Sequence, residues 1–419
     1  MPFAPHCVAL PPARLSLRLL LLSLGLYGGA PLAYAEGFLD DATTSLNLRN
    51  MFFQRDYQGS TAPVAKRAEW AQGFILQGTS GYTPGPVGFG VEWLGKYGIR
   101  LDSGDGRTGT GLLPVHDSGP AREYGRFGAL AKIRLSATEL KYGEQIMGLP
   151  VVKTNDARLL PQTYTGTTLV SNELTSASFY AGRLETFTGR DSAYQEKLHM
   201  HGSTVGGDHF DYAGVEWRTP DKRLQLAYWR AQLKDIYDQD LYRLTFDQPF
   251  GNAVLRFDSG LYVSREAGAA RAGDLDNRAG WLGLKWMQGG HSVLAGYQRM
   301  FGDDDFIGLQ DAGTPMVNHA NNIFAYGRER SWQLRYDYDF VAMGVPGLTA
   351  MTRYIRGWDV QRSNETNGHE WERDFNLRYT LQSGPLARLN VSLSLSSLRS
   401  TFQSSFDETK ITVGYPLTW

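Results

Sequence analysis

The chain has 419 residues, and its 42 lysine and arginine side chains nearly balance 43 aspartate and glutamate side chains, for a net charge of −1. This balance gives no support to nucleic-acid binding, and one cysteine excludes an internal disulfide framework. The 22 Tyr, 20 Phe, 10 Trp and 48 Gly suit a membrane β-barrel, whose aromatic, apolar lipid face surrounds a polar lumen.

Residues 1–35 have the pattern of a secretory signal peptide. Basic residues precede an apolar run over 19–30, and the small-x-small sequence Ala-Tyr-Ala ends at Ala35. The apolar run is shorter than the ~20 residues that a transmembrane helix needs. We therefore predict cleavage near Ala35, which removes Cys7 and leaves residues 36–419 as a single outer-membrane barrel domain.

Apolar and polar residues alternate with a period of two through most of the remaining chain. In the clearest run, Trp332, Leu334 and Tyr336 share one face, and Gln333 and Arg335 share the other. Such runs hold ~10 residues, the length of a tilted membrane-spanning strand. The sequence predicts eighteen strands, at 43–55, 67–79, 87–99, 125–137, 139–146, 168–175, 177–186, 208–218, 222–233, 238–248, 252–264, 277–287, 291–301, 329–341, 347–359, 370–382, 387–402 and 406–419.

Short and long connections alternate between these strands, as in outer-membrane barrels with tight turns on one side and loops on the other. The predicted fold class is therefore all-β: an 18-stranded antiparallel transmembrane β-barrel with a constriction loop folded inward. A soluble β-sandwich is the alternative, but its strands usually have ~5–6 residues. An active transporter would need a plug domain before the barrel, and the first strand starts too early for one.

The last ten residues, KITVGYPLTW, alternate to the end of the sequence, with Trp419 on the apolar face. A closed barrel must pair its last strand with its first, so we expect this strand to lie beside residues 43–55. A terminal aromatic residue suits the interfacial girdle of a barrel wall.

Three stretches have a recognisable sequence: LNLRNMFFQRDY (46–57), EWAQGFILQGTSGYTPGPVGFGVEWLGKYGIRLDSG (69–104) and LPVVKTNDARLLPQTYTG (149–166). They resemble the first three strands and the constriction loop of the OprD-type family of substrate-specific outer-membrane porins. The resemblance covers nearly all of the mature chain. It implies a monomer or weak homotrimer that passes small carboxylate-bearing solutes by diffusion, and a terminal aromatic residue that the outer-membrane assembly machinery reads.

Strand phase places several basic side chains in the lumen, on strands that closure of the barrel makes contiguous. Arginine binds carboxylates through its planar fork and stays charged, and several weak sites in series allow passage without trapping. The resemblance places the family's basic ladder in the same region. We expect a substrate track, although pairing with Asp337, Asp339, Asp374 and Glu408 is the alternative. Its members are Arg49, Arg55, Arg335, Arg353, Arg378, Arg399 and Lys410, where Arg399 faces inward only if a bulge shifts its strand by one residue.

The segment 147–167 is the candidate constriction loop, with Asp156, Arg158 and Tyr164 as its lumen-facing polar groups. Asp156 and Arg158 could select solutes or brace the loop against the wall, and the sequence leaves both roles open.

Other chemistry has weak support in the sequence. The stretch HMHGSTVGGDHFD (199–211) and the GDDDF sequence (302–306) lack the ligand spacing of a zinc site or a calcium loop. We therefore expect no cofactor and no metal. Hydrolase, zinc-protease, P-loop and dithiol motifs are missing, so we expect no enzyme.

The sequence thus predicts an outer-membrane porin for diffusive uptake of small organic or aromatic acids, with outer-membrane lipid, lipopolysaccharide and the assembly machinery as further partners. The alternatives are a porin for basic amino acids and small peptides, and an outer-membrane or adhesive β protein without a transport role.

Overall fold

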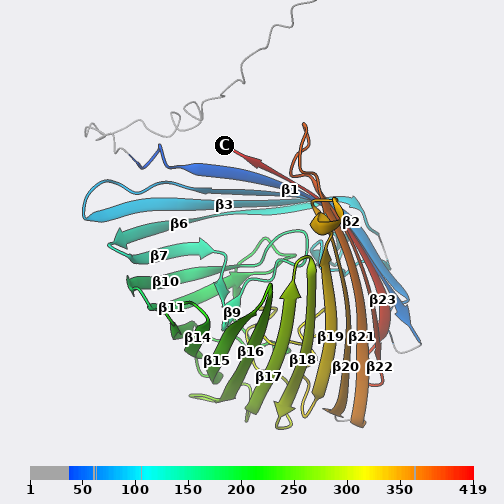
Figure 1. The fold of residues 1–419 in the computed structure, drawn as a ribbon. Coiled ribbons are helices and arrows are strands. Elements are labelled where there is room, and N and C mark those ends of the chain that lie inside the picture. The colour runs from blue at the N-terminus through cyan, green and yellow to red at the C-terminus, as the bar shows by residue number, and fades with distance from the viewer. Residues whose placement is uncertain (1–36, 60–61, 63, 105, 363–364) are drawn as a thin grey trace, which may run out of the picture. The chain divides into compact units, whose positions relative to one another are not determined.

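The computed structural model describes residues 37–419 except 60, 61, 63, 105, 363 and 364. The predicted signal peptide lies outside these described residues and stays a prediction. Antiparallel strands form a wall around a lumen that the longer loops enter (Figure 1). The strands of this wall are β1 (Thr43–Gln58), β2 (Lys66–Thr79), β3 (Val87–Asp102), β6 (Glu123–Leu135), β7 (Thr138–Gln145), β10 (Thr163–Leu174), β11 (Ala177–Thr188), β13 (Phe210–Arg218), β14 (Leu224–Leu233), β15 (Tyr237–Phe250), β16 (Ala253–Glu266), β17 (Asp276–Gln288), β18 (His291–Phe301), β19 (Arg330–Asp339), β20 (Leu348–Arg362), β21 (Glu365–Thr380), β22 (Asn390–Ser400) and β23 (Ser405–Thr418).

These are eighteen strands, as predicted, and each overlaps the range expected from the sequence. Five two-residue strands lie in the loops instead: β4 (Val115–His116), β5 (Gly119–Pro120), β8 (Gly148–Leu149), β9 (Val152–Lys153) and β12 (Glu196–Lys197). The predicted and observed numbers of wall strands agree because each crossing of the membrane needs its own run of alternating apolar and polar residues.

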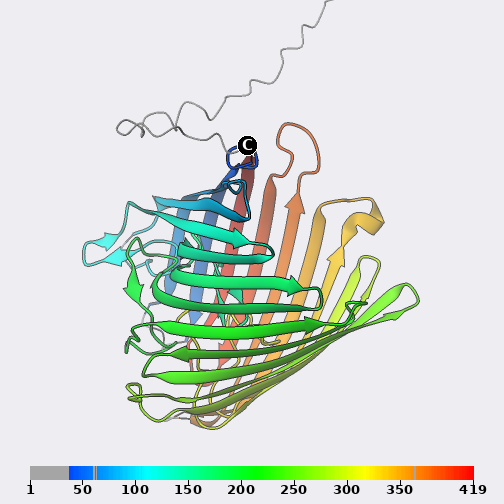
Figure 2. The ribbon, with the colours of Figure 1, turned by 90° about the vertical axis from the view of Figure 1, so that its left-hand side faces the viewer.

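The barrel closes between β1 and β23, whose antiparallel register runs from Ser45 opposite Thr418 to Gln58 opposite Ser405. Trp419 extends this ladder, because its amide donates to the Thr44 carbonyl at 2.9 Å and Thr44 donates back at 3.3 Å. Figure 2 shows the end of the chain beside the first strand. Trp419 therefore takes part in the ladder that closes the wall.

The two faces of the wall differ as the alternation predicts. On β19, Trp332 and Leu334 are 39% and 52% exposed on the outside, whereas Gln333 is buried in the lumen. The apolar outer face needs lipid around it, and the polar inner face can hold charged groups.

The connection between β19 and β20 takes up the last two residues of the predicted strand 329–341. The strand ends at Asp339, and the short 3₁₀ helix η2 (Phe340–Met343) follows. It begins where the Asp339 carboxylate accepts from the Val341 amide and ends at Gly344, whose positive φ of 78° suits glycine. Within the described part of the chain, no helix is long and apolar enough to cross a membrane.

Candidate functional site: the constriction of the pore

The constriction loop is the connection between β7 and β10, residues 146–162. Its Leu159 is buried against the wall at β2 and β3. A Cβ atom at Gly73 or at Gly98 would lie 3.1 Å from this leucine side chain. Two glycines therefore provide the space into which the loop packs, and the loop folds inward as predicted.

A second loop, between β18 and β19, meets the constriction loop inside the lumen. Asn155 donates to the Asp311 carbonyl at 3.0 Å, and Gln162 donates to the Gln310 carbonyl at 3.1 Å. Glu372 on β21 holds this second loop by accepting the amides of Asn321 at 3.0 Å and Asn322 at 2.9 Å. The two loops border a cavity of about 430 Å³. The sequence indicated that the second loop was long, but not that it lines the pore.

Arg49 on β1 holds the constriction loop through Asp156. The guanidinium donates to both carboxylate oxygens, at 2.6 and 3.0 Å, and to the Arg158 carbonyl at 2.9 Å. Asp156 lines the cavity between the loops and also a second cavity of about 330 Å³ that reaches Asn47 and Pro416. The Arg49–Asp156 pair therefore stands where the two cavities meet, and of the two roles left open Asp156 at least braces the loop.

Arg158 lies next to Phe53, which is 1% exposed. Its guanidinium carbon is 4.8 Å from the centre of the Phe53 ring, and its Nε donates to the Thr110 carbonyl at 2.9 Å. Among the described residues, no carboxylate forms an ion pair with Arg158. Burial lowers the pKa of Arg158, and the nearby Arg190 charge lowers it further, but the group stays charged at neutral pH.

Two more cations surround the same Phe53 ring, with Arg55 at 5.6 Å and Lys410 at 5.2 Å from its centre. Both bind Glu408, which is 2% exposed: the ion pairs measure 2.5 Å to Arg55 and 2.7 Å to Lys410. Together with Arg158, three cations thus share one ring, and two of the three share one carboxylate. This Phe53 cluster, which comprises Phe53, Arg55, Arg158, Lys410 and Glu408, therefore has more positive than negative charges. The alternation of side chains along β1 could have indicated that Phe53 faces inward, on the same face as Arg55.

A row of directly paired residues, here called the register row, connects this cluster with the cations of β19 and β20. It crosses six neighbouring strands in the order β19, β20, β21, β22, β23 and β1, with one residue on each strand. Neighbouring strands are ~4.8 Å apart, so the row spans ~24 Å of wall. Its members in order are Arg335, Arg353, Asp374, Ser396, Glu408 and Arg55.

Most of these cations are paired with acids of the wall. Arg335 binds Asp337 at 2.6 Å, and Arg353 binds Asp374 at 2.7 Å with side chains only 12% and 5% exposed. The pairing that the sequence left as an alternative is therefore present. The two acids of the register row, Asp374 and Glu408, lie in its middle with cations at both ends, and each ion pair restricts the orientation of its guanidinium group.

The structure places Arg378 near one end of the wall. β21 runs from Glu365 to Thr380, so Arg378 is its third-last residue, near the end opposite the long loops. It is exposed, on the same strand face as Asp374, and makes no ion pair with any residue that the structure describes.

The prediction for Arg399 is wrong. Its inward orientation needed a bulge, but the ladder from β21 through β22 to β23 continues without a shift in register. Leu398 is buried on the inner face, so Arg399 points outward, where it binds Asp407 at 2.9 Å. It does not belong to the track.

Tyr164 is no lumen-facing group of the loop either. β10 begins at Thr163, five residues before the predicted start, and this moves Tyr164 into the wall. Its side chain is 1% exposed, with its ring 6.5 Å from that of Phe187. β10 thus includes residues before the alternating run 168–175, where Tyr164 packs against other apolar side chains.

Two cations that sequence reasoning missed line the cavity between the loops. Lys153 is exposed at the end of β9 and has no ion-pair partner within the described residues, whereas Arg190 binds Asp311 at 3.3 Å. Both lie in connections, where no strand phase predicts a direction. For Lys153, its positive charge within the predicted constriction loop 147–167 could have indicated a residue that lines the pore.

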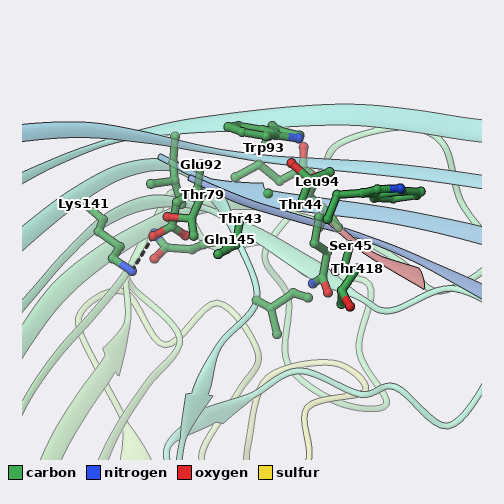
Figure 3. A pocket seen from close by; sticks show the side chains of 16 residues that line it. Thr43, Thr44, Ser45, Thr79, Glu92, Trp93, Leu94, Lys141, Gln145 and Thr418 are labelled. Atoms are coloured by element: carbon green, nitrogen blue, oxygen red, sulfur yellow. Dashed lines mark hydrogen bonds and ion pairs between the residues drawn. The ribbon is translucent and has the colours of Figure 1, made fainter. Parts of the chain in front are cut away.

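The wall at β3, β6 and β7 carries further lumen charges, which strand parity could have revealed. Lys141 binds Glu92 at 2.9 Å across a cavity of about 530 Å³ (Figure 3), and Lys132 approaches the same carboxylate at 3.6 Å. Arg126 binds Glu144 at 2.6 Å. Lys96 also binds Glu144, at 3.5 Å, and Lys141 also binds Glu139, at 3.1 Å, so four cations share three carboxylates on this wall. Each of these cations has an acidic partner, whereas Arg158 and Lys153 have none among the described residues.

The two candidate metal motifs form no site in the described part of the chain, where no three metal-ligating side chains converge. His199 packs its ring 5.5 Å from that of Phe187, and His209 faces Asp211 at 3.5 Å.

A family model described as outer membrane porin, OprD family, matches residues 36–419. The chain belongs to the OprD family. The porin-like protein GalP of Pseudomonas putida is 44% identical over 391 residues, which cover 92% of this chain and 94% of that protein. The crystal structure of OccK9 (OpdG) from Pseudomonas aeruginosa matches with a TM-score of 0.90 at 44% identity, over 91% of this chain and 100% of the other. The crystal structure of Pseudomonas aeruginosa OpdK with vanillate matches with a TM-score of 0.87 at 43% identity and the same coverage.

Membership in the OprD family confirms three predictions from the sequence. The chain is an outer-membrane protein, a passive porin rather than an enzyme, and a closed barrel of eighteen strands. The family resemblance read from the sequence motifs is likewise confirmed.

Replacing Arg353 by alanine in this OprD-family porin will destabilise the barrel. The change leaves the nearly buried Asp374 without its partner, and breaking a buried pair costs about 3 kcal/mol. The temperature at which the unboiled protein loses its compact form on gels should fall. Adding Asp374→Asn should restore part of the loss, and a double variant as unstable as Arg353→Ala would contradict this account.

Replacing Asp156 by asparagine will release the Arg49 charge from its carboxylate partner. Anion-over-cation permeability should rise about threefold at low salt, because one negative charge leaves the point where the two cavities meet. Reversal potentials across planar bilayers measure this ratio. Asp407→Asn, on the outer face, is the matched control; equal ratios in both variants would show that Asp156 does not influence permeating ions.

Removing Trp419 will reduce the amount of this OprD-family barrel in the outer membrane. The change deletes a residue that extends the closing ladder at the edge of the wall. Immunoblots of fractionated membranes should show a loss of about tenfold, the size expected when an interfacial anchor and two ladder hydrogen bonds are removed together. Trp419→Phe should restore normal abundance. Normal abundance of the truncated chain would refute this role.

Proposed function

We propose that this porin takes up small carboxylate-bearing solutes, organic or aromatic acids, by diffusion along a basic track. The track consists of Lys153, Arg158, the Phe53 cluster, the register row and Arg378. Residues 1–35 act as a cleaved signal peptide in this proposal, and 36–419 form the whole barrel.

The observation that carries the proposal is the imbalance of charge at the constriction. Arg158 and Lys153 line the cavity between the loops, and neither makes an ion pair with a described residue. A narrow pore with low-dielectric walls concentrates the field of such charges and attracts counter-ions. A carboxylate in the cavity could bind to the Arg158 fork and leave toward Arg49, whose own charge Asp156 partly offsets.

The related porins support the same substrate class. OpdK was crystallised with vanillate, an aromatic carboxylate, and its fold matches that of this chain over 91% of the residues. An anionic solute therefore passes or binds in a relative of the same architecture.

The alternative of a channel for basic amino acids needs an acidic group that can bind an ammonium ion. Asp156 is held by Arg49 and Asp311 by Arg190, so both acids of the cavity are already paired. This pairing favours a solute with an anionic group.

Uptake into liposomes tests the proposal. Barrels are reconstituted with a panel of labelled carboxylates, neutral sugars of the same size and basic amino acids. Carboxylates should enter faster than sugars, and the difference should shrink with added salt because ions screen the pore charges. Equal rates for all three classes, or faster entrance of basic amino acids, would refute carboxylate selectivity.

A further inference from the structure

The outer face of the barrel carries a group of arginines that the pore does not use. Each of the strands β17, β18, β19 and β20 has one such arginine, next to a residue that is buried toward the lumen. In order these are Arg278, Arg299, Arg330 and Arg356, and Arg328 lies just before β19. The buried neighbours that fix their outward direction are Ala279, Met300, Ser331 and Ile355.

These outer arginines lie at the level where the apolar part of the wall ends. Arg278 is the third residue of β17, and Arg299 is the third-last residue of β18, both at the ends that lead to the long loops. Further along β17 the outer face continues with Leu282 and Leu284, which are 51% and 47% exposed. The arginines therefore sit near the boundary between lipid chains and polar headgroups on the long-loop side.

A hollow of about 470 Å³ opens between the ends of β18, β19 and β20, lined by Arg299, Arg328 and Arg330 together with Phe301 and Asp359. Arg299 lies directly opposite Arg330 in the β18–β19 register. Like charges in directly opposed positions repel each other unless an anion lies between them.

The hollow has more guanidinium groups than carboxylates to bind them. Arg330 binds Asp359 at 3.2 Å, and Arg328 binds Asp303. Arg299 makes no ion pair with any described residue; it lies 4.7 Å from the Phe301 ring, and its buried Nε has no hydrogen-bond partner. The aromatic pairs Trp332–Tyr354 and Tyr297–Trp358 flank these strands on the outer face.

The arginines on another part of the same rim have a different environment. Arg183 binds Asp211 at 2.7 Å, and Arg230 binds both Asp238 at 2.7 Å and Asp240 at 2.8 Å. This second group is matched or exceeded by acids, in contrast to Arg299 in the hollow at β18–β20.

We propose that this hollow binds a phosphate group of the lipopolysaccharide in the outer leaflet. The guanidinium forks of Arg299 and Arg330 would grip the phosphate oxygens, a geometry for which arginine is suited. The acyl chains of the same molecule would lie along the exposed apolar side chains of β17–β19. A lipid fits better than free phosphate because the hollow adjoins Phe301 and the lipid-facing wall.

The test measures lipid binding to purified barrels by native mass spectrometry. The probes are bisphosphorylated lipid A, enzymatically dephosphorylated lipid A, and inorganic phosphate as a competitor. Wild-type protein should prefer the phosphorylated lipid, and Arg299→Gln with Arg330→Gln should weaken its binding about tenfold, as expected for the loss of two interfacial cations. Single-channel conductance should not change, because the site faces away from the pore.

Arg183→Gln with Arg230→Gln is the matched control and should bind phosphorylated lipid A like wild type. The single Arg299→Gln variant leaves the Arg330–Asp359 pair intact and should still bind more weakly than wild type. Equal binding of both forms of lipid A, equal loss in the control, or complete displacement by millimolar phosphate would overturn the proposal. Unchanged lipid binding with a loss of oligomer on native gels would assign the surface to contact between copies of the chain.

Discussion

Shortening the constriction loop, by replacing residues 154–161 with a three-residue glycine–serine linker, will widen the pore. The segment contains Asp156, Arg158 and Leu159, which attach the loop to β1, to the Phe53 ring and to the β2–β3 wall. Single-channel conductance should increase roughly twofold or more, because the narrowest section limits flow through a water-filled pore. Preference for carboxylates over neutral sugars of equal size should weaken in the liposome assay.

The matched control shortens the connection between β16 and β17 within residues 267–275, which line neither of the two cavities at the constriction. This control should keep wild-type conductance. If the shortened constriction loop also left conductance unchanged, the narrowest point would have to lie elsewhere in the lumen.

Replacing Arg158 by glutamine will remove most of the preference for anions. Among the described residues of the constriction, this guanidinium has an aromatic ring and backbone carbonyls as neighbours but no carboxylate partner. Anion-over-cation permeability should fall about three- to tenfold at low salt, a typical effect of one fixed charge in a narrow pore. The difference should diminish at high salt. Arg158→Lys should restore the charge but only part of the carboxylate uptake, because lysine lacks the planar fork.

Arg335→Gln is the control for position, because this arginine is bound by Asp337 on its own strand. Its effect on selectivity should be the smaller of the two. If Arg335→Gln reduced anion preference as much as Arg158→Gln, the wall as a whole would set selectivity and the constriction would have no special role.

The sequence by itself determined the barrel, because each strand repeats the same local requirement. One face must be apolar against lipid and the other polar against water, so the alternation marks every crossing, including the run up to Trp419 that pairs with β1. The same parity placed Arg49, Arg55, Arg335, Arg353 and Lys410 in the lumen, where the structure has them.

The tertiary structure alone decided how these charges are used. Strand phase gives a side, but not the partner on the neighbouring strand, so the Arg353–Asp374 and Arg55–Glu408 pairs depend on register. Phase also fails where the alternation is weak, which explains the outward direction of Arg399 and the burial of Tyr164. The loops have no period at all. Lys153, Arg158 and Arg190 line one cavity because Leu159 packs over Gly73 and Gly98, and because Asp156 and Asn155 attach the constriction loop to Arg49 and to the second loop.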